Sequence, residues 1–151
     1  MNPQTLPTVT FESLEIEKEI KSAHGLIDYV VLTTLRIAKE YDAMPRRIKF
    51  TWQKCDELMT IYLNTRVLEL SPVFAEFWVA DIKDTKTVLE HMIAHEIGHY
   101  IIDKSLPGSD RDVWLDMEER YADAFAQKIT GLGRAEAEGL IDAINDAILG
   151  R

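Results

Sequence analysis

The sequence is poor in cysteine and in basic residues, and it contains no long apolar run. A single cysteine, Cys55, excludes an intrachain disulfide and a zinc site built from several cysteines. Seventeen Lys and Arg residues against 26 Asp and Glu residues give a net charge of -9, which disfavours unaided binding to nucleic acid. No apolar stretch approaches the roughly 20 residues of a membrane span, and the N-terminal residues lack a signal-peptide pattern. These absences predict a cytoplasmic protein with no membrane partner.

Length and composition fit one packed domain. The chain has 151 residues, of which 46% are hydrophobic and 28% charged, an ordinary globular composition. Single-core domains are commonly about 100 to 150 residues long. We therefore expect one domain over residues 1–151, in which residues 1–10, with their two prolines, form a loose leader.

Helical periodicity dominates both ends of the chain. Apolar residues recur at helical spacing from Phe11 to Tyr41, which predicts one long helix or two helices separated near Gly25. Two helices are also expected near the C-terminus, one over 111–130 that is capped by Ser109 or Asp110 and stops before Gly131, and one over 134–149.

The middle of the chain combines strands with one further helix. The β-branched and aromatic segments 47–52 and 58–64 predict two antiparallel strands. Segment 65–84 fits either a short helix or a strand with a loop, because Pro72 interrupts it. A helix over 88–103 is expected to begin at a capping box formed by Thr87 and Glu90. The expected fold class is α+β.

Three of the four histidines lie four residues apart in the segment HMIAHEIGHY, residues 91–100. His95 and His99 are one helical turn apart and can grip one ion, and Glu96 completes a His-Glu-x-x-His motif. In this motif the two histidines bind Zn²⁺ and the glutamate deprotonates the attacking water. We predict one Zn²⁺ per chain at this place.

Two neighbouring residues have other predicted roles. His91 is excluded as a third ligand, because it lies about 12 Å from His99 along a straight helix whereas Zn–N bonds are about 2.1 Å long. A hydrogen-bonded or supporting role is expected for it, and a structural one for His24. Gly98, inside the helix, predicts the close approach of another backbone or of a ligand.

The third ligand is expected from the next helix, which offers Glu118 and Glu119. Glu119 occupies a slot in the helical stripe of Leu115, Ala122, Ala126 and Ile129, whereas Glu118 shares a competing stripe with Trp114, Tyr121 and Phe125. Periodicity favours Glu119 only weakly, and solvation of both glutamates is the alternative.

The segment HEIGHY followed by ERYADAFA (119–126) resembles the ImmA/IrrE family of zinc metallopeptidases. That family has His-Glu-x-x-His and then Glu-x-x-Ala-Asn/Asp-x-Phe-Ala, and the match covers residues 88–130. The resemblance implies a mainly helical minimal zincin of the gluzincin type, with a small antiparallel sheet packed on the helix of the motif. It also implies that Glu119 is the third zinc ligand and that Asp123 orients a ligand histidine by accepting its other ring N–H.

The function expected from these features is zinc-dependent hydrolysis of peptide bonds in an intracellular protein, with a regulatory protein as a further potential partner. A second donor to the oxyanion is expected among Tyr62, Tyr100 and Tyr121. By the resemblance, the strand carrying Leu58, Thr60, Tyr62 and Asn64 pairs with extended substrate.

Three alternatives stay open. The first is a non-catalytic interaction module stapled by zinc, such as a phage accessory protein or antitoxin; Glu96, which such a site does not need, favours catalysis over it. The second is a SprT-like protease, which would use a third histidine although none follows His99. The third is a protease that a partner delivers to DNA-bound proteins.

Overall fold

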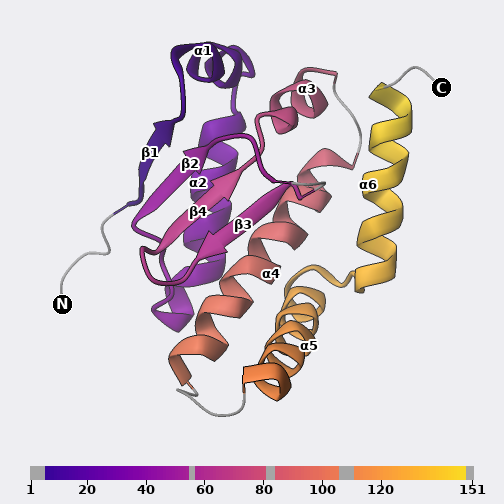
Figure 1. The fold of residues 1–151 in the computed structure, drawn as a ribbon. Helices are drawn as coiled ribbons and strands as arrows, with labels where there is room; N and C mark the ends of the chain where they lie inside the picture. Colours follow the sequence, from indigo (N-terminus) through magenta and orange to yellow (C-terminus); the bar gives the residue numbers. More distant parts are fainter. Residues whose placement is uncertain (1–5, 55–56, 81–83, 106–110, 149–151) are drawn as a thin grey trace.

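Four short strands form one mixed sheet in the order β1-β2-β4-β3 (Figure 1). The computed structural model describes residues 6–54, 57–80, 84–105 and 111–148, and for 104–105, 111–115 and 148 it describes the backbone alone. Strands β1 (Thr8–Phe11), β2 (Arg47–Phe50) and β4 (Val67–Leu70) are parallel neighbours, whereas β3 (Met59–Tyr62) runs antiparallel to β4 at the sheet edge.

The two predicted strands exist, but the prediction that they pair with each other is wrong. Strand β4, from the segment that the sequence left open, lies between them and makes the sheet mixed rather than antiparallel. A tight turn after Tyr62, with Arg66 at φ 59°, joins β3 to β4 as a hairpin. Sequence neighbours joined by a tight turn pair first, which leaves β2 to bond the other edge of β4.

The first helical region consists of two helices, as one of the two predictions stated. Helix α1 (Leu14–Ser22) and helix α2 (Leu26–Ala38) are separated at Gly25, whose φ of 89° suits glycine, and a 3-10 helix (Lys39–Tyr41) follows α2. Ser13 caps α1 by accepting a hydrogen bond from the Ile16 N–H. Residues Thr8–Thr10 belong to β1, so the predicted loose leader is wrong there, and residues 1–5 lie outside the described residues.

Four further helices complete the described part of the chain: α3 (Val73–Val79), α4 (Thr85–Ser105), α5 (Arg111–Thr130) and α6 (Arg134–Ile148). Helix α5 ends before Gly131, as predicted, whereas its predicted caps Ser109 and Asp110 lie outside the described residues. The predicted capping box of α4 is wrong, because the helix begins two residues before Thr87 and Glu90 instead binds Arg36 at 2.6 Å.

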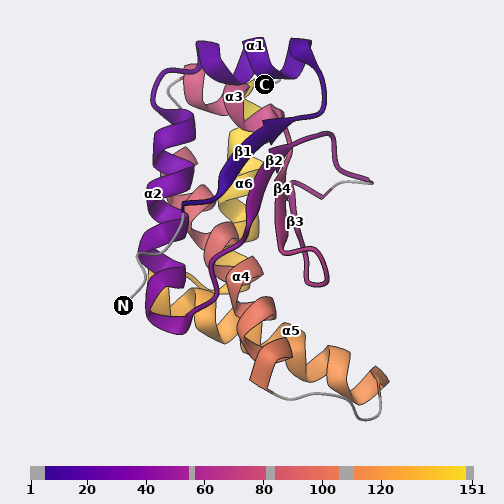
Figure 2. The same cartoon turned by 90° about the vertical axis from the view of Figure 1, so that its left-hand side faces the viewer.

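The sheet packs one face against helices, and α4 lies at the centre of the molecule. Figure 2 shows α2 and α4 on the same side of the strands. Alternate strand residues are buried in the core that this face forms, among them Ile48, Phe50, Leu68 and Leu70, while the residues between them are more exposed. Helix α4 also contacts α5, α6 and the edge strand β3. None of the described helices combines the length and low polarity needed to cross a bilayer.

Candidate metal centre

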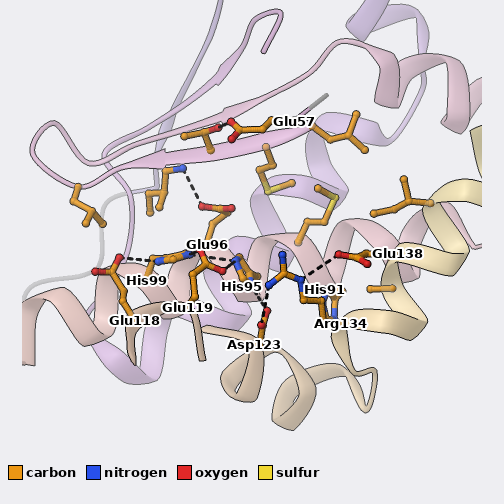
Figure 3. Close-up of a pocket in the computed structure, with 18 residues that line it drawn as sticks. Glu57, His91, His95, Glu96, His99, Glu118, Glu119, Asp123, Arg134 and Glu138 are labelled. Carbon is orange, nitrogen blue, oxygen red and sulfur yellow. Dashed lines mark hydrogen bonds and ion pairs between the residues drawn. The ribbon is translucent and has the colours of Figure 1, made fainter. Parts of the chain in front are cut away.

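Helix α4 has a core face and a site face. Ile93, Ala94 and Ile97 are completely buried in the core. His95, Glu96 and His99 lie on the other side, where they line a cavity of about 720 Å³ between β3, α4, α5 and α6 (Figure 3). The apolar residues of the motif therefore fix the helix in the core, and its polar residues face the cavity.

Gly98 lets α5 approach this helix closely. A Cβ atom at Gly98 would lie 3.0 Å from the Ala122 Cα and 3.3 Å from the Phe125 Cβ, which is tighter than ordinary contact. Ala122 and Ala126 are completely buried in the same contact between the helices. The predicted close approach at Gly98 is confirmed, and its consequence is that Glu119 of α5 reaches the histidines of α4.

One ligand atom from each of His95, His99 and Glu119 lies within 4.8 Å of the others. The two histidine Nε2 atoms are 3.1 Å apart, and the Glu119 carboxylate oxygens lie 2.9 Å from His99 Nε2 and 3.6 Å from His95 Nε2. Ligands placed tetrahedrally about 2.1 Å from one ion are themselves about 3.4 Å apart. The donor set therefore fits a metal ion, and it is the one such group among the described residues.

Both histidines are held by carboxylates through their other ring nitrogen. Asp123 Oδ1 lies 3.1 Å from His95 Nδ1, and Glu118 Oε1 lies 2.7 Å from His99 Nδ1 (Figure 3). Each carboxylate accepts the Nδ1–H and so leaves the Nε2 lone pair free to bind metal. Burial, followed by the neighbouring His99, lowers the pKa of His95 and favours the neutral ring that binds metal.

The burial of the two glutamates is the reverse of what the apolar stripe indicated. Glu118 is 7% exposed, whereas the Glu119 side chain is 48% exposed at the edge of the cavity. The buried stripe of α5 is Glu118, Ala122, Phe125 and Ala126, which mixes the two stripes considered in the sequence. From the sequence, Glu118 was considered only as the alternative to Glu119 for the third ligand position. The rule that each ligand histidine has its own carboxylate partner could have assigned it to His99.

Glu96 has the environment of a general base. Its Oε2 accepts a hydrogen bond from the Ile61 N–H of β3 at 3.1 Å. Burial raises the pKa of Glu96 from 4.5 to about 7, against the lowering effects of His99 and of this hydrogen bond. A carboxylate with a pKa near neutrality can both take up and release a proton at physiological pH.

His91 lies apart from the three converging residues, in agreement with the prediction that it is not a ligand. It is 5% exposed, and its Nδ1 lies 3.3 Å from the Thr130 hydroxyl at the end of α5. Burial lowers the pKa of His91 and favours its neutral form. His24 contributes only its backbone carbonyl, which accepts a hydrogen bond from the Trp78 indole N–H at 2.7 Å.

The three tyrosines predicted as oxyanion donors are not brought to the cavity. Tyr62 is 45% exposed at the end of β3, the Tyr100 ring lies under the Arg66 guanidinium at 5.3 Å, and Tyr121 stacks on Phe125. Tyr62 is the last residue of β3, and the ring of Tyr121 packs against Phe125, a residue that does not line the cavity.

Strand β3 lies beside α4 as expected, but the residues that face its free edge are not those predicted. The carbonyl groups of Leu58 and Tyr62 accept hydrogen bonds from Ser71 and Arg66, on the β4 side. In an antiparallel pair the alternate residues direct their backbone groups outward. The free edge of β3 is therefore formed by Met59 and Ile61 rather than by Leu58, Thr60 and Tyr62, and Asn64 lies beyond the end of β3.

Helix α6 adds an arginine that sequence reasoning missed. Arg134 lines the cavity, with Nη1 3.5 Å from Asp123 Oδ2 and Nε 3.1 Å from Glu138 Oε1 (Figure 3). It is the one Lys or Arg among the described residues that line this cavity. Arg134 is the first residue of α6 and reaches Asp123 across the turn at Gly131, and this contact leaves no periodic signal beyond the Arg134–Glu138 spacing.

Comparison of the chain with protein-family models, with curated proteins and with solved structures finds no match. The chemical role of the site is therefore inferred from the chain's own residues. They provide a three-residue group that could hold a metal ion, two carboxylates that orient its histidines, and a half-buried glutamate beside it.

Proposed function

We propose that this protein is a zinc-dependent metallopeptidase that hydrolyses peptide bonds of a cytoplasmic protein substrate. The observation that carries the proposal is the convergence of His95, His99 and Glu119 beside the buried carboxylate of Glu96. The acidic chain, with net charge -9, fits a protein substrate better than nucleic acid.

Zinc suits the donor set better than other common ions. Catalytic zinc sites commonly have three protein ligands, such as two imidazoles and one carboxylate, and keep a fourth position open. Mg²⁺ and Ca²⁺ instead prefer oxygen ligands alone. When bound, zinc supplies a water of lowered pKa and polarises the substrate carbonyl.

The chain's own residues would then move the proton and fix the geometry. Glu96 would accept the proton of the attacking water and later donate it to the leaving amine. The Ile61 N–H holds the Glu96 carboxylate, and Asp123 and Glu118 hold the rings of His95 and His99. Strand β3 lies at the sheet edge next to Glu96; its Ile61 N–H is bound to Glu96, which leaves the other outward-facing backbone groups of this edge to pair with an extended polypeptide.

The proposal is tested by peptide-library hydrolysis with zinc-loaded protein, chelator-treated protein and the Glu96→Gln variant. We expect cleavage by the zinc-loaded protein, its loss on chelation with recovery on adding zinc, and a decrease of about 100-fold or more in Glu96→Gln. Glu96→Gln should retain zinc because its amide replaces no ligand. Cleavage that survives in Glu96→Gln would refute the mechanism.

The same experiment distinguishes the non-catalytic alternative. One equivalent of bound zinc without any hydrolysis that depends on Glu96 would favour an interaction module stapled by zinc. The position of Glu96 supports the catalytic function, since a structural zinc site gains nothing from a half-buried carboxylate that binds no ion.

A further inference from the structure

His91 has a polar ring atom that neither the fold nor the proposed hydrolysis uses. Its side chain is 5% exposed and lines the cavity beside the metal ligands (Figure 3). Among the described residues its hydrogen bond is the one to Thr130, which involves the ring nitrogen Nδ1. The other ring nitrogen, Nε2, therefore has no partner in the described part of the chain. A buried polar atom without a partner costs free energy, so a bound ligand is one reason to keep it.

The contacts of Thr130 decide which nitrogen of His91 carries the hydrogen. The Thr130 hydroxyl donates its hydrogen to the Ala126 carbonyl at 2.8 Å and accepts a hydrogen bond from the Leu132 N–H at 3.2 Å. A hydroxyl has one hydrogen to donate, so toward His91 Nδ1, 3.3 Å away, it accepts and Nδ1 carries the hydrogen. Burial lowers the pKa of His91 and keeps its ring neutral. Nε2 is therefore an acceptor with a free lone pair.

The position and surroundings of Nε2 define the group that it can bind. His91 lies one helical turn before His95 on α4, about 6 Å away between the Cβ atoms, so a substrate held at the metal centre reaches it only with a long side chain. A carboxylate is excluded because Nε2 is itself an acceptor. A lysine or arginine is disfavoured by Arg134, which lines the same cavity and already pairs with Asp123 and Glu138. The phenol of tyrosine combines the required length with an uncharged O–H donor.

We propose that His91 is a specificity-determining residue, whose Nε2 accepts a hydrogen bond from the hydroxyl of a substrate tyrosine. The inference rests on the proposed function, because the metal centre holds the substrate against this part of the cavity. It gives His91 a role in substrate selection that is separate from metal binding and from proton transfer. It also adds the substrate class: a polypeptide with a tyrosine near the peptide bond cleaved.

Binding of two hydroxamic acids to the zinc-loaded protein, measured by calorimetry, tests this hydrogen bond without hydrolysis. Both compounds carry the same zinc-binding group and the same ring: 3-(4-hydroxyphenyl)propanohydroxamic acid has the phenol hydroxyl, and 3-phenylpropanohydroxamic acid lacks it. Because they differ in this hydroxyl alone, the apolar contacts of the ring cancel in the comparison. We expect the phenol compound to bind about tenfold more tightly, the gain from one well-formed hydrogen bond.

His91→Phe removes the acceptor and keeps a ring at this position, so the phenol compound should lose its advantage while the phenyl compound binds as before. The matched control is His24→Phe, at an exposed histidine outside the cavity lining, which should keep the tenfold difference. Equal affinities of the wild type for the two compounds, or an advantage of the phenol that survives in His91→Phe, would overturn the proposal while leaving zinc binding intact. Binding of neither compound would contradict the zinc site, and the role of His91 with it.

Nitrogen NMR of the histidine rings in the zinc-loaded wild type gives a second measurement that requires no variant. The free protein should show His91 with its hydrogen on Nδ1 and an unprotonated Nε2. The Nε2 signal should shift toward that of a hydrogen-bonded acceptor on adding the phenol compound, and should change much less with the phenyl compound. A hydrogen on Nε2 in the free protein, or equal shifts with both compounds, would refute the assignment.

Discussion

Replacing Glu96 by glutamine should stabilise the metal-free protein, and by an amount that depends on pH. Burial raises the pKa of Glu96 from 4.5 to about 7, so the folded protein holds this proton more tightly than the unfolded chain does. Between these values the unfolded chain is ionised while the folded protein is still protonated, and the free energy of unfolding falls as the pH rises. Glutamine has no charge to bury, and its side-chain oxygen can still accept the hydrogen bond of Ile61.

The magnitude follows from the difference between the two pKa values. A difference of about 2.5 units, at about 1.4 kcal/mol per unit, gives an upper limit of about 3.5 kcal/mol. The gain of Glu96→Gln over the wild type should be near zero below pH 4.5 and should reach its full value above pH 7. Solvent that reaches the cavity lowers this limit.

Urea unfolding in the presence of a chelator, followed by circular dichroism across this pH range, measures the gain. Asp142→Asn, an exposed carboxylate on α6, is the control and should change stability by no more than a few tenths of a kcal/mol. A gain for Glu96→Gln that is the same at low and high pH would refute the reasoning, because the penalty would then not come from ionisation.

Two further predictions concern the packing and the ligand support. Gly98→Ala should destabilise the protein by about 1 to 2 kcal/mol in urea unfolding, because a Cβ would meet Ala122 at 3.0 Å, a cost that exceeds the gain in helix propensity. Its control, Gly139→Ala in α6, has nothing within 4 Å and should stabilise by up to about 1 kcal/mol; equal effects would contradict the close packing. Glu118→Gln and Asp123→Asn should each weaken zinc binding about 10- to 100-fold in a competition titration, whereas unchanged affinity would exclude their orienting roles.

Local sequence signals located the helix of the motif, because its residues act within one turn. Helical spacing alone places His95 and His99 on one face. A glycine at position 98, which has no side chain, predicted the close contact with another helix. A break near Gly25 was one of the two alternatives predicted from the sequence, and the φ of 89° at Gly25 suits glycine.

Features that depend on how helices and strands pack against one another could not be predicted from the sequence. The pairing of β2 with β4 follows from the β3–β4 hairpin, and neither strand pattern specifies its neighbour. The burial of Glu118 rather than Glu119 depends on the packing of α5 against α4, in which the buried face of α5 combines residues of both predicted stripes. Arg134 reaches Asp123 because the turn at Gly131 places the start of α6 beside α5. In each case a tertiary contact decides between options that periodicity leaves nearly equal.

X-ray absorption spectroscopy of the zinc-loaded protein tests the central claim most directly. The arrangement of His95, His99 and Glu119 predicts one zinc per chain with two imidazole ligands and oxygen in the remaining positions. Failure to bind one equivalent of zinc, or a zinc coordinated by three histidines, would contradict the account.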